Sequence, residues 1–179
     1  WWHVWDNKPF PKFNSVLYDA TDKINCHSYM TYELIKDHFP GKTNFIPHAL
    51  PENIFYKLDD ATIRRHRTEI LGKGKEDNFV LFWVNRNAKR KRPSDLLLSW
   101  KYFLEKIPQS DRSKVNLVLH TDPFDNEGPN LVATAEMLGI TDTLNFSTQR
   151  IDFEKMNVLH NISDVCINMS FAEGFGFDA

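Results

Sequence analysis

Cysteine is scarce in this sequence, with only Cys26 and Cys166 among 179 residues. Both fall in segments predicted to be buried strands, which excludes a disulfide framework and favours a reducing compartment. Long apolar runs are also absent, since none approaches the roughly 18 residues that span a bilayer. The first residues, WWHVWD, lack the basic and apolar regions of a signal peptide. We therefore expect a cytoplasmic protein. Because the sequence does not begin with methionine, we interpret it as a piece of a longer chain.

An excess of positive charge is missing as well. The 22 basic and 24 acidic residues give a net charge of −2, which argues against nucleic acid as a partner. The seven histidines have no paired spacing, so no metal site is predicted. No G-x-G-x-x-G motif follows a first strand, and this disfavours an oxidoreductase that uses a dinucleotide cofactor.

Alternating strand and helix patterns fill most of the sequence after residue 60. The segment 79–84 is apolar throughout, as in a strand that is buried on both faces. The helix that follows has apolar residues at helical spacing and Ser94 as its expected N-cap. Further strands are predicted at 115–120, 144–146 and 165–169, and further helices at 60–71, 130–138 and 152–162. This alternation predicts an α/β fold with a Rossmann-like parallel sheet and helices on both faces.

The first part of the chain is less regular. Short strands are predicted at 23–27 and 44–46, with a helix at 29–39 between them. The first twenty residues are rich in aromatic side chains but show neither a helical nor a strand period.

Polar residues follow the predicted strands of the sheet. In open α/β sheets, ligands bind beyond the carboxyl ends of the strands. The loop after 79–84 is strongly basic and holds Arg86, Lys89, Arg90, Lys91 and Arg92 within seven positions. The later loops contribute Thr121, Asp122, Ser147, Thr148, Glu173 and the glycine-rich segment 174–176.

Cations beside a glycine turn predict a ligand that carries phosphate. Arg86 and Lys91 would hold the anion, with help from backbone N–H groups at the glycine turn. The alternative is that both are solvated loop residues without a binding role. We expect Lys89, Arg90 and Arg92 to be such residues. Glu173 is itself negative, so it suits sugar hydroxyl groups, which a carboxylate accepts well. Its alternative role is that of a first-turn carboxylate stabilised by a helix dipole.

Three segments resemble the motifs of one enzyme family, and they occur in the family's order. The sequence IPHA at 46–49 resembles a segment that enters the donor domain. Arg86 and Lys91 have the spacing of an R-x4-K pair, and SFAEGFG at 170–176 resembles the start of an E-x7-E motif. Together they resemble the retaining GT-B glycosyltransferases of family 4, also called the glycosyl transferases group 1 family. The resemblance runs from about residue 18 to the end of the chain.

The resemblance implies a role for each matching residue. Arg86 and Lys91 bind the donor diphosphate, and Glu173 contacts the transferred sugar. The glycine loop contacts the sugar or the phosphate through its backbone, and the loop 147–151 contacts the nucleobase. The expected binding residues are therefore Arg86, Lys91, Ser147, Thr148, Ile151, Glu173, Gly174, Phe175 and Gly176. The catalytic residues are expected among Arg86, Lys91 and Glu173, and GT-B enzymes need no bound metal.

The resemblance also implies a domain organisation. Residues 1–45 correspond to a remnant of the N-terminal acceptor domain and its linker, and residues 46–179 to a partial donor-binding domain. The second glutamate of E-x7-E would lie beyond Ala179, as would the helix that the glycine loop opens. The donor domain is therefore predicted to be incomplete at its C-terminus.

The expected function is transfer of a sugar from a nucleotide-diphosphate sugar to an acceptor, with retention at the anomeric carbon. The alternative is a module that binds a nucleotide or nucleotide sugar without catalysis. The acceptor stays open among glycan, lipid and protein. Apolar surface at Trp1, Trp2, Trp5 and the sheet edge beyond 165–169 predicts self-association.

Overall fold

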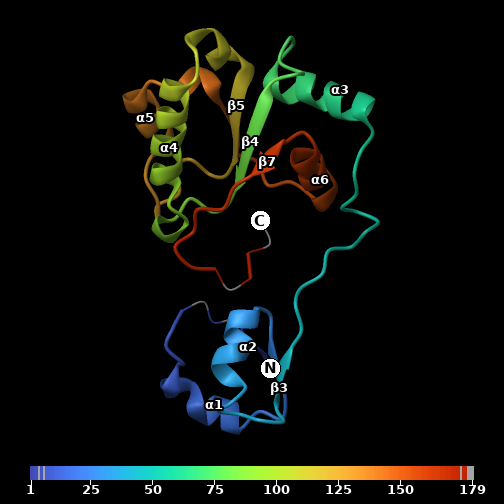
Figure 1. Cartoon of the computed structure of the whole chain (residues 1–179), viewed down its shortest axis with the longest axis vertical. Helices are drawn as coiled ribbons and strands as arrows, with labels where there is room; N and C mark the ends of the chain where they lie inside the picture. Colours follow the sequence, from blue (N-terminus) through green and yellow to red (C-terminus); the bar gives the residue numbers. More distant parts are fainter. Residues whose placement is uncertain (4, 6, 174, 177–179) are drawn as a thin grey trace. The chain divides into compact units, whose positions relative to one another are not determined.

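The computed structural model describes residues 1–3, 5, 7–173 and 175–176, and it divides the chain into two compact units (Figure 1). The smaller unit comprises Trp1–Leu50 and the described part of a segment that starts at Ala172. The larger unit comprises Pro51–Phe171. Each unit has its own parallel sheet and its own apolar core.

The sheet of the larger unit has four parallel strands in the order β6-β5-β4-β7. These strands are β4 (Phe79–Val84), β5 (Val115–His120), β6 (Leu144–Ser147) and β7 (Val165–Cys166). In the register, Phe82 lies beside Val118 of β5 and beside Cys166 of β7. The parallel sheet predicted from the sequence is confirmed.

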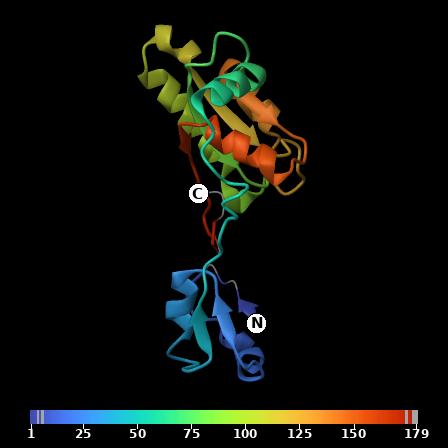
Figure 2. The same ribbon diagram turned by 90° about the vertical axis from the view of Figure 1, so that its right-hand side faces the viewer.

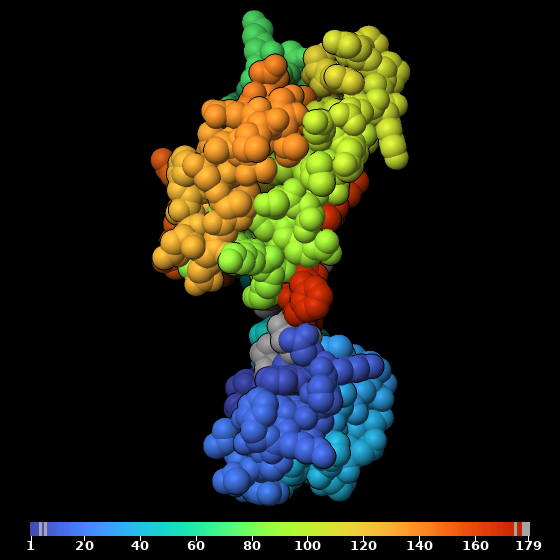
Figure 3. Space-filling view, turned by 90° about the vertical axis from the view of Figure 1, so that its left-hand side faces the viewer, coloured from blue at the N-terminus to red at the C-terminus, as the bar shows by residue number. Residues whose placement is uncertain are grey.

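Helices cover both faces of this sheet. On one face lie α4 (Pro93–Lys106) and α5 (Leu131–Leu138), and on the other α3 (Asp60–Leu71) and α6 (Phe153–Asn161) (Figure 1). Figure 3 shows the face that α4 and α5 cover. Successive strand residues point to opposite faces, so Leu117 belongs to the α4/α5 core and Val118 to the α3/α6 core. The predicted Rossmann-like α/β arrangement is therefore confirmed.

Polar residues begin the helices of the larger unit. The side chains of Asp59, Asn130 and Asp152 accept the backbone N–H groups three residues further on, at 2.9, 3.0 and 2.8 Å. The prediction of Ser94 as an N-cap is wrong, because α4 already begins at Pro93. Proline suits the first helical position, since its fixed φ is helical and its missing N–H would have no helical partner. The residue before it, Arg92, has a positive φ of 55°.

A ladder of three asparagines crosses the sheet near its amino edge. Asn78 Nδ2 donates to Asn116 Oδ1 at 2.7 Å, and Asn116 Nδ2 donates to Asn145 Oδ1 at 2.9 Å. Asn145 Nδ2 in turn donates to the carbonyl of Ile70 in α3 at 3.3 Å. Asn78 and Asn116 are both buried, so these bonds satisfy amides that would otherwise be costly to remove from water.

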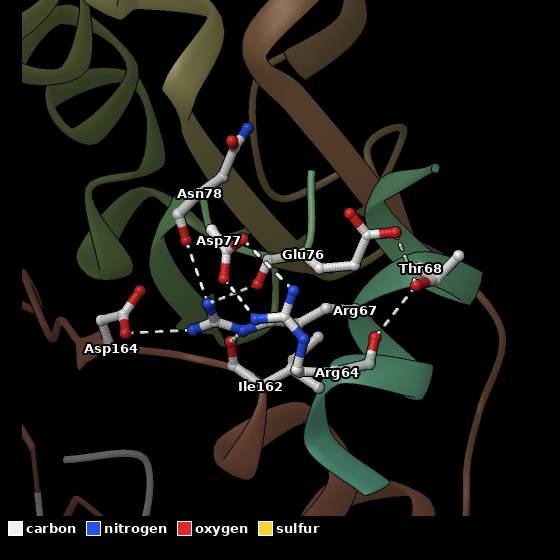
Figure 4. A network of polar contacts seen from close by, with 8 residues as sticks. All are labelled: Arg64, Arg67, Thr68, Glu76, Asp77, Asn78, Ile162 and Asp164. Carbon is white, nitrogen blue, oxygen red and sulfur yellow. Dashed lines mark hydrogen bonds and ion pairs between the residues drawn. The ribbon is translucent and has the colours of Figure 1, made fainter. Parts of the chain in front are cut away.

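Arg67 joins three segments of the larger unit (Figure 4). Its side chain is only 12% exposed and donates four hydrogen bonds of 2.9–3.1 Å. The acceptors are the backbone carbonyls of Ile162, Glu76 and Asn78 and the carboxylate of Asp164. Asp164 also accepts the N–H of Val80 at 2.7 Å. The neighbouring Arg64 forms an exposed ion pair with Asp77. Arg67 therefore ties α3 to the starts of β4 and β7.

Short 3-10 helices complete the larger unit. They are η2 (Lys89–Lys91), η3 (Gln109–Lys114) and η4 (Thr141–Thr143).

The smaller unit has three parallel strands in the order β1-β2-β3 (Figure 2). Its elements are β1 (Trp2–His3), η1 (Lys12–Asn14), α1 (Ser15–Asp19), β2 (Ile24–Cys26), α2 (Tyr29–Ile35) and β3 (Thr43–Phe45). Its core is formed by Tyr18, Ile24, Cys26 and Ile35. The sequence did not predict β1, because a strand of two residues is too short to show a period.

The last strand differs from its prediction. A strand is predicted at 165–169, but β7 covers only Val165–Cys166. Cys166 is exposed rather than buried, because β7 lies at the edge of the sheet beside β4 and has no second neighbouring strand among the described residues. Cys26 is buried in β2 as predicted.

Candidate functional site

The carboxyl edge of the larger sheet gathers several residues that the sequence singled out. Arg86 follows β4 by two residues, Thr121 directly follows β5, and Thr148 directly follows β6. Because β4, β5 and β6 are parallel neighbours, the loops after them share one edge of the sheet.

Lys91 differs from the other cations of the basic loop. It lies in η2 and is only 8% exposed, whereas Lys89, Arg90 and Arg92 are exposed. Arg92, just before α4, donates to the carboxylate of Asp95 in the first turn of that helix at 2.8 Å. Lysine is among the residue types least often buried, since moving an ammonium group out of water is costly. The basic run is therefore not a uniform solvated surface.

Arg86 is held by two carboxylates of the loop between β5 and α5. Its Nε and Nη2 donate to the two carboxylate oxygens of Asp125 at 2.7 and 3.2 Å. Its Nη1 lies 3.0 Å from Glu127 Oε1. The hydrogen bond from Arg86 lowers the pKa of Asp125, and the N–H of Glu127 acts in the same direction. Arg86, which we expected to hold a ligand anion, thus binds two anionic groups of its own chain.

The loop after β6 places its predicted residues in different surroundings. The Ser147 hydroxyl lies 2.9 Å from His120 Nδ1, and its carbonyl accepts the N–H of Thr121 at 3.1 Å. Thr148 is exposed, while Ile151 packs against the α3/α6 core. Contact of this loop with a nucleobase remains a prediction.

The last predicted residues belong to the smaller unit. Glu173, Phe175 and Gly176 lie in the segment that starts at Ala172, and Gly174 is outside the described residues. The ring of Phe175 meets that of His48 edge-on, with centroids 5.1 Å apart. The expected shared edge therefore contains Arg86, Lys91, Ser147 and Thr148, and the inclusion of Glu173 in it remains a prediction.

Buried side-chain oxygens without partners accumulate near this edge. Asn87 Oδ1, Thr121 Oγ1 and Ser170 Oγ have no hydrogen-bond partner among the described residues. They follow β4, β5 and β7, which are neighbours in the sheet. Unsatisfied buried groups are uncommon in folded proteins, and they often mark functional regions.

Sequence reasoning missed Asn87, Asp125 and Glu127. Asn87 is fully buried and donates through Nδ2 to the carbonyl of Pro129 at 2.8 Å. Asp125 and Glu127 lie in the same loop as Asp122, which the strand-end argument had already reached. That argument could have identified them as rim residues, but it could not show that their carboxylates pair with Arg86.

Metal-ligand clusters and membrane-spanning helices are both absent from the described part of the chain. No group of three or more His, Cys, Asp or Glu side chains there is arranged to hold a metal ion. None of its helices combines the length and the apolar character needed to cross a bilayer.

The sequence matches no protein-family model, and no curated protein is significantly similar to it. Comparison of the fold with solved structures, by contrast, finds similar proteins. The parallel sheet of the larger unit, with helices on both faces, has the Rossmann-like α/β architecture of GT-B glycosyltransferase domains.

Three solved structures illustrate this likeness. Alr3699/HepE of Anabaena, solved with UDP-glucose, has a TM-score of 0.68 and 18% identity over 92% of this chain and 44% of its own. The trehalose 6-phosphate synthase of Burkholderia multivorans has a TM-score of 0.70 and 11% identity over 97% of this chain and 46% of its own. The C-terminal domain of the glycosyl transferase group 1 family protein LpcC from Francisella tularensis has a TM-score of 0.56 and 16% identity. That match covers 73% of this chain and 63% of the LpcC domain.

At these identities the likeness is one of fold. The chain spans less than half the length of the HepE and trehalose 6-phosphate synthase chains that it matches.

Proposed function

We propose that this chain is the donor-binding part of a glycosyltransferase that uses a nucleotide-diphosphate sugar. The observation that carries the proposal is the burial of Lys91, at the carboxyl edge of the sheet, within a run of exposed cations. The fold supports it, since the similar HepE structure was solved with UDP-glucose. Residues 1–45 would then be a remnant of the acceptor domain and its linker, and residues 46–179 a partial donor domain of family 4.

The proposed mechanism assigns the charge of the leaving group to Lys91 and Arg86. When the bond between sugar and diphosphate breaks, negative charge builds on the diphosphate. Cations already fixed beside that position stabilise the transition state, and such preorganised electrostatic stabilisation is usually the largest contribution to catalysis. Glu173 would orient the sugar by accepting its hydroxyl groups, and transfer would retain the anomeric configuration.

The first test compares cations within the basic loop by calorimetric titration with UDP. Lys91→Ala and Arg86→Ala should each weaken binding by about tenfold or more, as expected for hydrogen bonds to a charged group. Lys89→Ala is the matched control, because Lys89 is exposed and neighbours the same site. It should change the Kd less than about twofold, since its attraction is screened by salt.

The result that contradicts the proposal is also specific. If Lys89→Ala, Lys91→Ala and Arg86→Ala lower the affinity equally, and the loss disappears in moderate salt, the loop is a diffuse anion surface. The proposed diphosphate site would then be wrong.

A second candidate function is a module that binds a nucleotide sugar without catalysis. The pairing of Arg86 with Asp125 and Glu127 favours this candidate, since the two carboxylates offset the positive charge that transfer would need beside the leaving diphosphate. Incubation with UDP-glucose and a panel of glycan, lipid and protein acceptors distinguishes the two. Release of UDP that Glu173→Gln abolishes supports the enzyme, whereas binding without release supports the module.

A further inference from the structure

The loop after β4 and the loop between β5 and α5 are locked together beside Arg86. The N–H of Lys89 donates to the carbonyl of Glu127 at 3.2 Å, and Asn87 Nδ2 donates to the carbonyl of Pro129. Gly128 packs so closely on Asn87 that a β-carbon there would overlap the asparagine side chain. These contacts fix the backbone at Asp125 and Glu127 relative to the loop that carries Arg86.

Arg86 uses only part of its hydrogen-bonding capacity in these contacts. A guanidinium group has five N–H donors in a rigid planar fork. Asp125 takes the side formed by Nε and Nη2, and Glu127 approaches Nη1. Because Asp125 takes the Nε/Nη2 side, the outer end of the fork, formed by Nη1 and Nη2, is the side left for a bidentate contact with phosphate. Glu127 contacts Nη1 of this end, whereas Asp125 reaches Nη2 only together with Nε.

The two carboxylates differ in how firmly they are held. The Asp125 side chain is 14% exposed, and its Oδ1 also accepts the N–H of Glu127 at 2.9 Å. The Glu127 side chain is 57% exposed, and its only carboxylate contact in the described part of the chain is with Arg86. An exposed single ion pair is weak, whereas a half-buried bidentate pair fixes the geometry of the guanidinium.

We propose that Asp125 positions Arg86 for the donor diphosphate and that Glu127 occupies the ligand end of Arg86 until a diphosphate displaces it. This inference rests on the proposed function, because it assumes that Arg86 binds the diphosphate. Asp125 would keep its contacts when the ligand is bound, and Glu127 would turn out to solvent. The two acidic residues therefore have opposite effects on affinity.

The test measures the Kd of UDP, and separately of inorganic pyrophosphate, for the full chain and its variants. Glu127→Gln should lower the Kd by about two- to fivefold, the scale of an exposed charge pair. Asp125→Asn should raise the Kd by about fivefold or more, because a neutral amide loses the charge that orients the guanidinium. Asp122→Asn is the matched control. It removes one negative charge from the same loop, and its Oδ1 contacts the N–H of Phe124 rather than Arg86.

The outcomes separate this inference from the proposed function. If Arg86→Ala binds UDP as well as the unmodified chain, the proposed function fails at this residue. If Arg86→Ala binds UDP weakly but Glu127→Gln has the same Kd as Asp122→Asn, the proposed competition between Glu127 and the diphosphate for Arg86 is wrong, while the proposed function stands. If Asp125→Asn tightens binding, only the positioning role is wrong.

A double variant distinguishes an effect of Asp125→Asn on Arg86 from an effect on the loop itself. In the Arg86→Ala background, Asp125→Asn should cause no further loss of affinity if Asp125 acts through Arg86. A further loss in that background would instead mean that Asp125 supports the loop alone, and it would overturn the positioning role.

Discussion

His120, at the end of β5, is half-buried, and burial lowers the pKa of its imidazole while contact with Ser147 acts in the opposite sense. Burial also lowers the pKa of His3, whose Nε2 lies 2.7 Å from the Tyr18 hydroxyl. Both side chains therefore bind protons less readily in the folded state than in the unfolded state. The stability that this difference provides is present above the unfolded pKa of 6.5 and is lost as the pH falls through the lower folded values.

We therefore expect the free energy of unfolding to be smaller at about pH 5.5 than at about pH 7.5. Urea denaturation at the two pH values measures this difference. His120→Gln should reduce the pH dependence, because the glutamine does not titrate. The carboxylates with lowered pKa, such as Asp77 and Asp125, act only at more acidic pH. A pH dependence that His120→Gln leaves unchanged would contradict the role given to His120.

The individual residues of the site were only partly predictable. Arg86 and Lys91 could be found because basic residues after an apolar strand point to the ligand edge of a parallel sheet. The sequence also predicted that Lys89 is solvated, and Lys89 is exposed. The burial of Lys91 could not be predicted, because it depends on the 3-10 turn of η2. The pairing of Arg86 with Asp125 joins residues 39 positions apart, and no local pattern records such a contact.

At the scale of elements, two of the three arginines of α3 have different surroundings (Figure 4). Arg67 is nearly buried and bonds to three backbone carbonyls and one carboxylate. We expect Arg67→Ala to lower the free energy of unfolding by about 2–4 kcal/mol, since buried acceptors lose a charged donor. Arg64→Ala is the matched control on the same helix. It should leave stability close to that of the unmodified chain, because its pair with Asp77 is exposed.

Chemical denaturation of the two variants measures the difference. Equal losses of stability would mean that α3 is held by its apolar face rather than by Arg67.

The longer elements were predicted well, whereas β1 was missed and β7 was predicted too long. β4, β5 and α4 follow clear apolar patterns, and their observed bounds lie within about two residues of those expected. β1 and β7 have two residues each, too few for a pattern. Their strand conformation depends on pairing with β2 and β4, which is a tertiary effect.

For the whole molecule, the exposed strand edge at β7 is the feature with the clearest consequence for assembly. Val165 is 46% exposed and Cys166 is exposed beside it. An apolar strand edge offers unpaired backbone groups to a second chain. We expect the sedimentation coefficient to rise with protein concentration, as it does for a self-associating protein.

Val165→Lys should reduce this association, because a charged side chain on an edge strand opposes pairing. Met137→Lys is the control, since Met137 is 87% exposed but lies on α5, away from the strand edge. Equal sedimentation of the two variants would exclude β7 as the contact.

The asparagine ladder has a consequence for how the chain reaches this fold. Strands of similar apolar character can pair one residue out of step, and such a slip turns every side chain to the opposite face. In β5, that slip would move Asn116 from the α3/α6 face into the α4/α5 core, where apolar side chains surround it. Its amide would lose Asn78 and Asn145 together. The ladder therefore specifies the register of the strands. It destabilises the misaligned sheet as well as stabilising the aligned one.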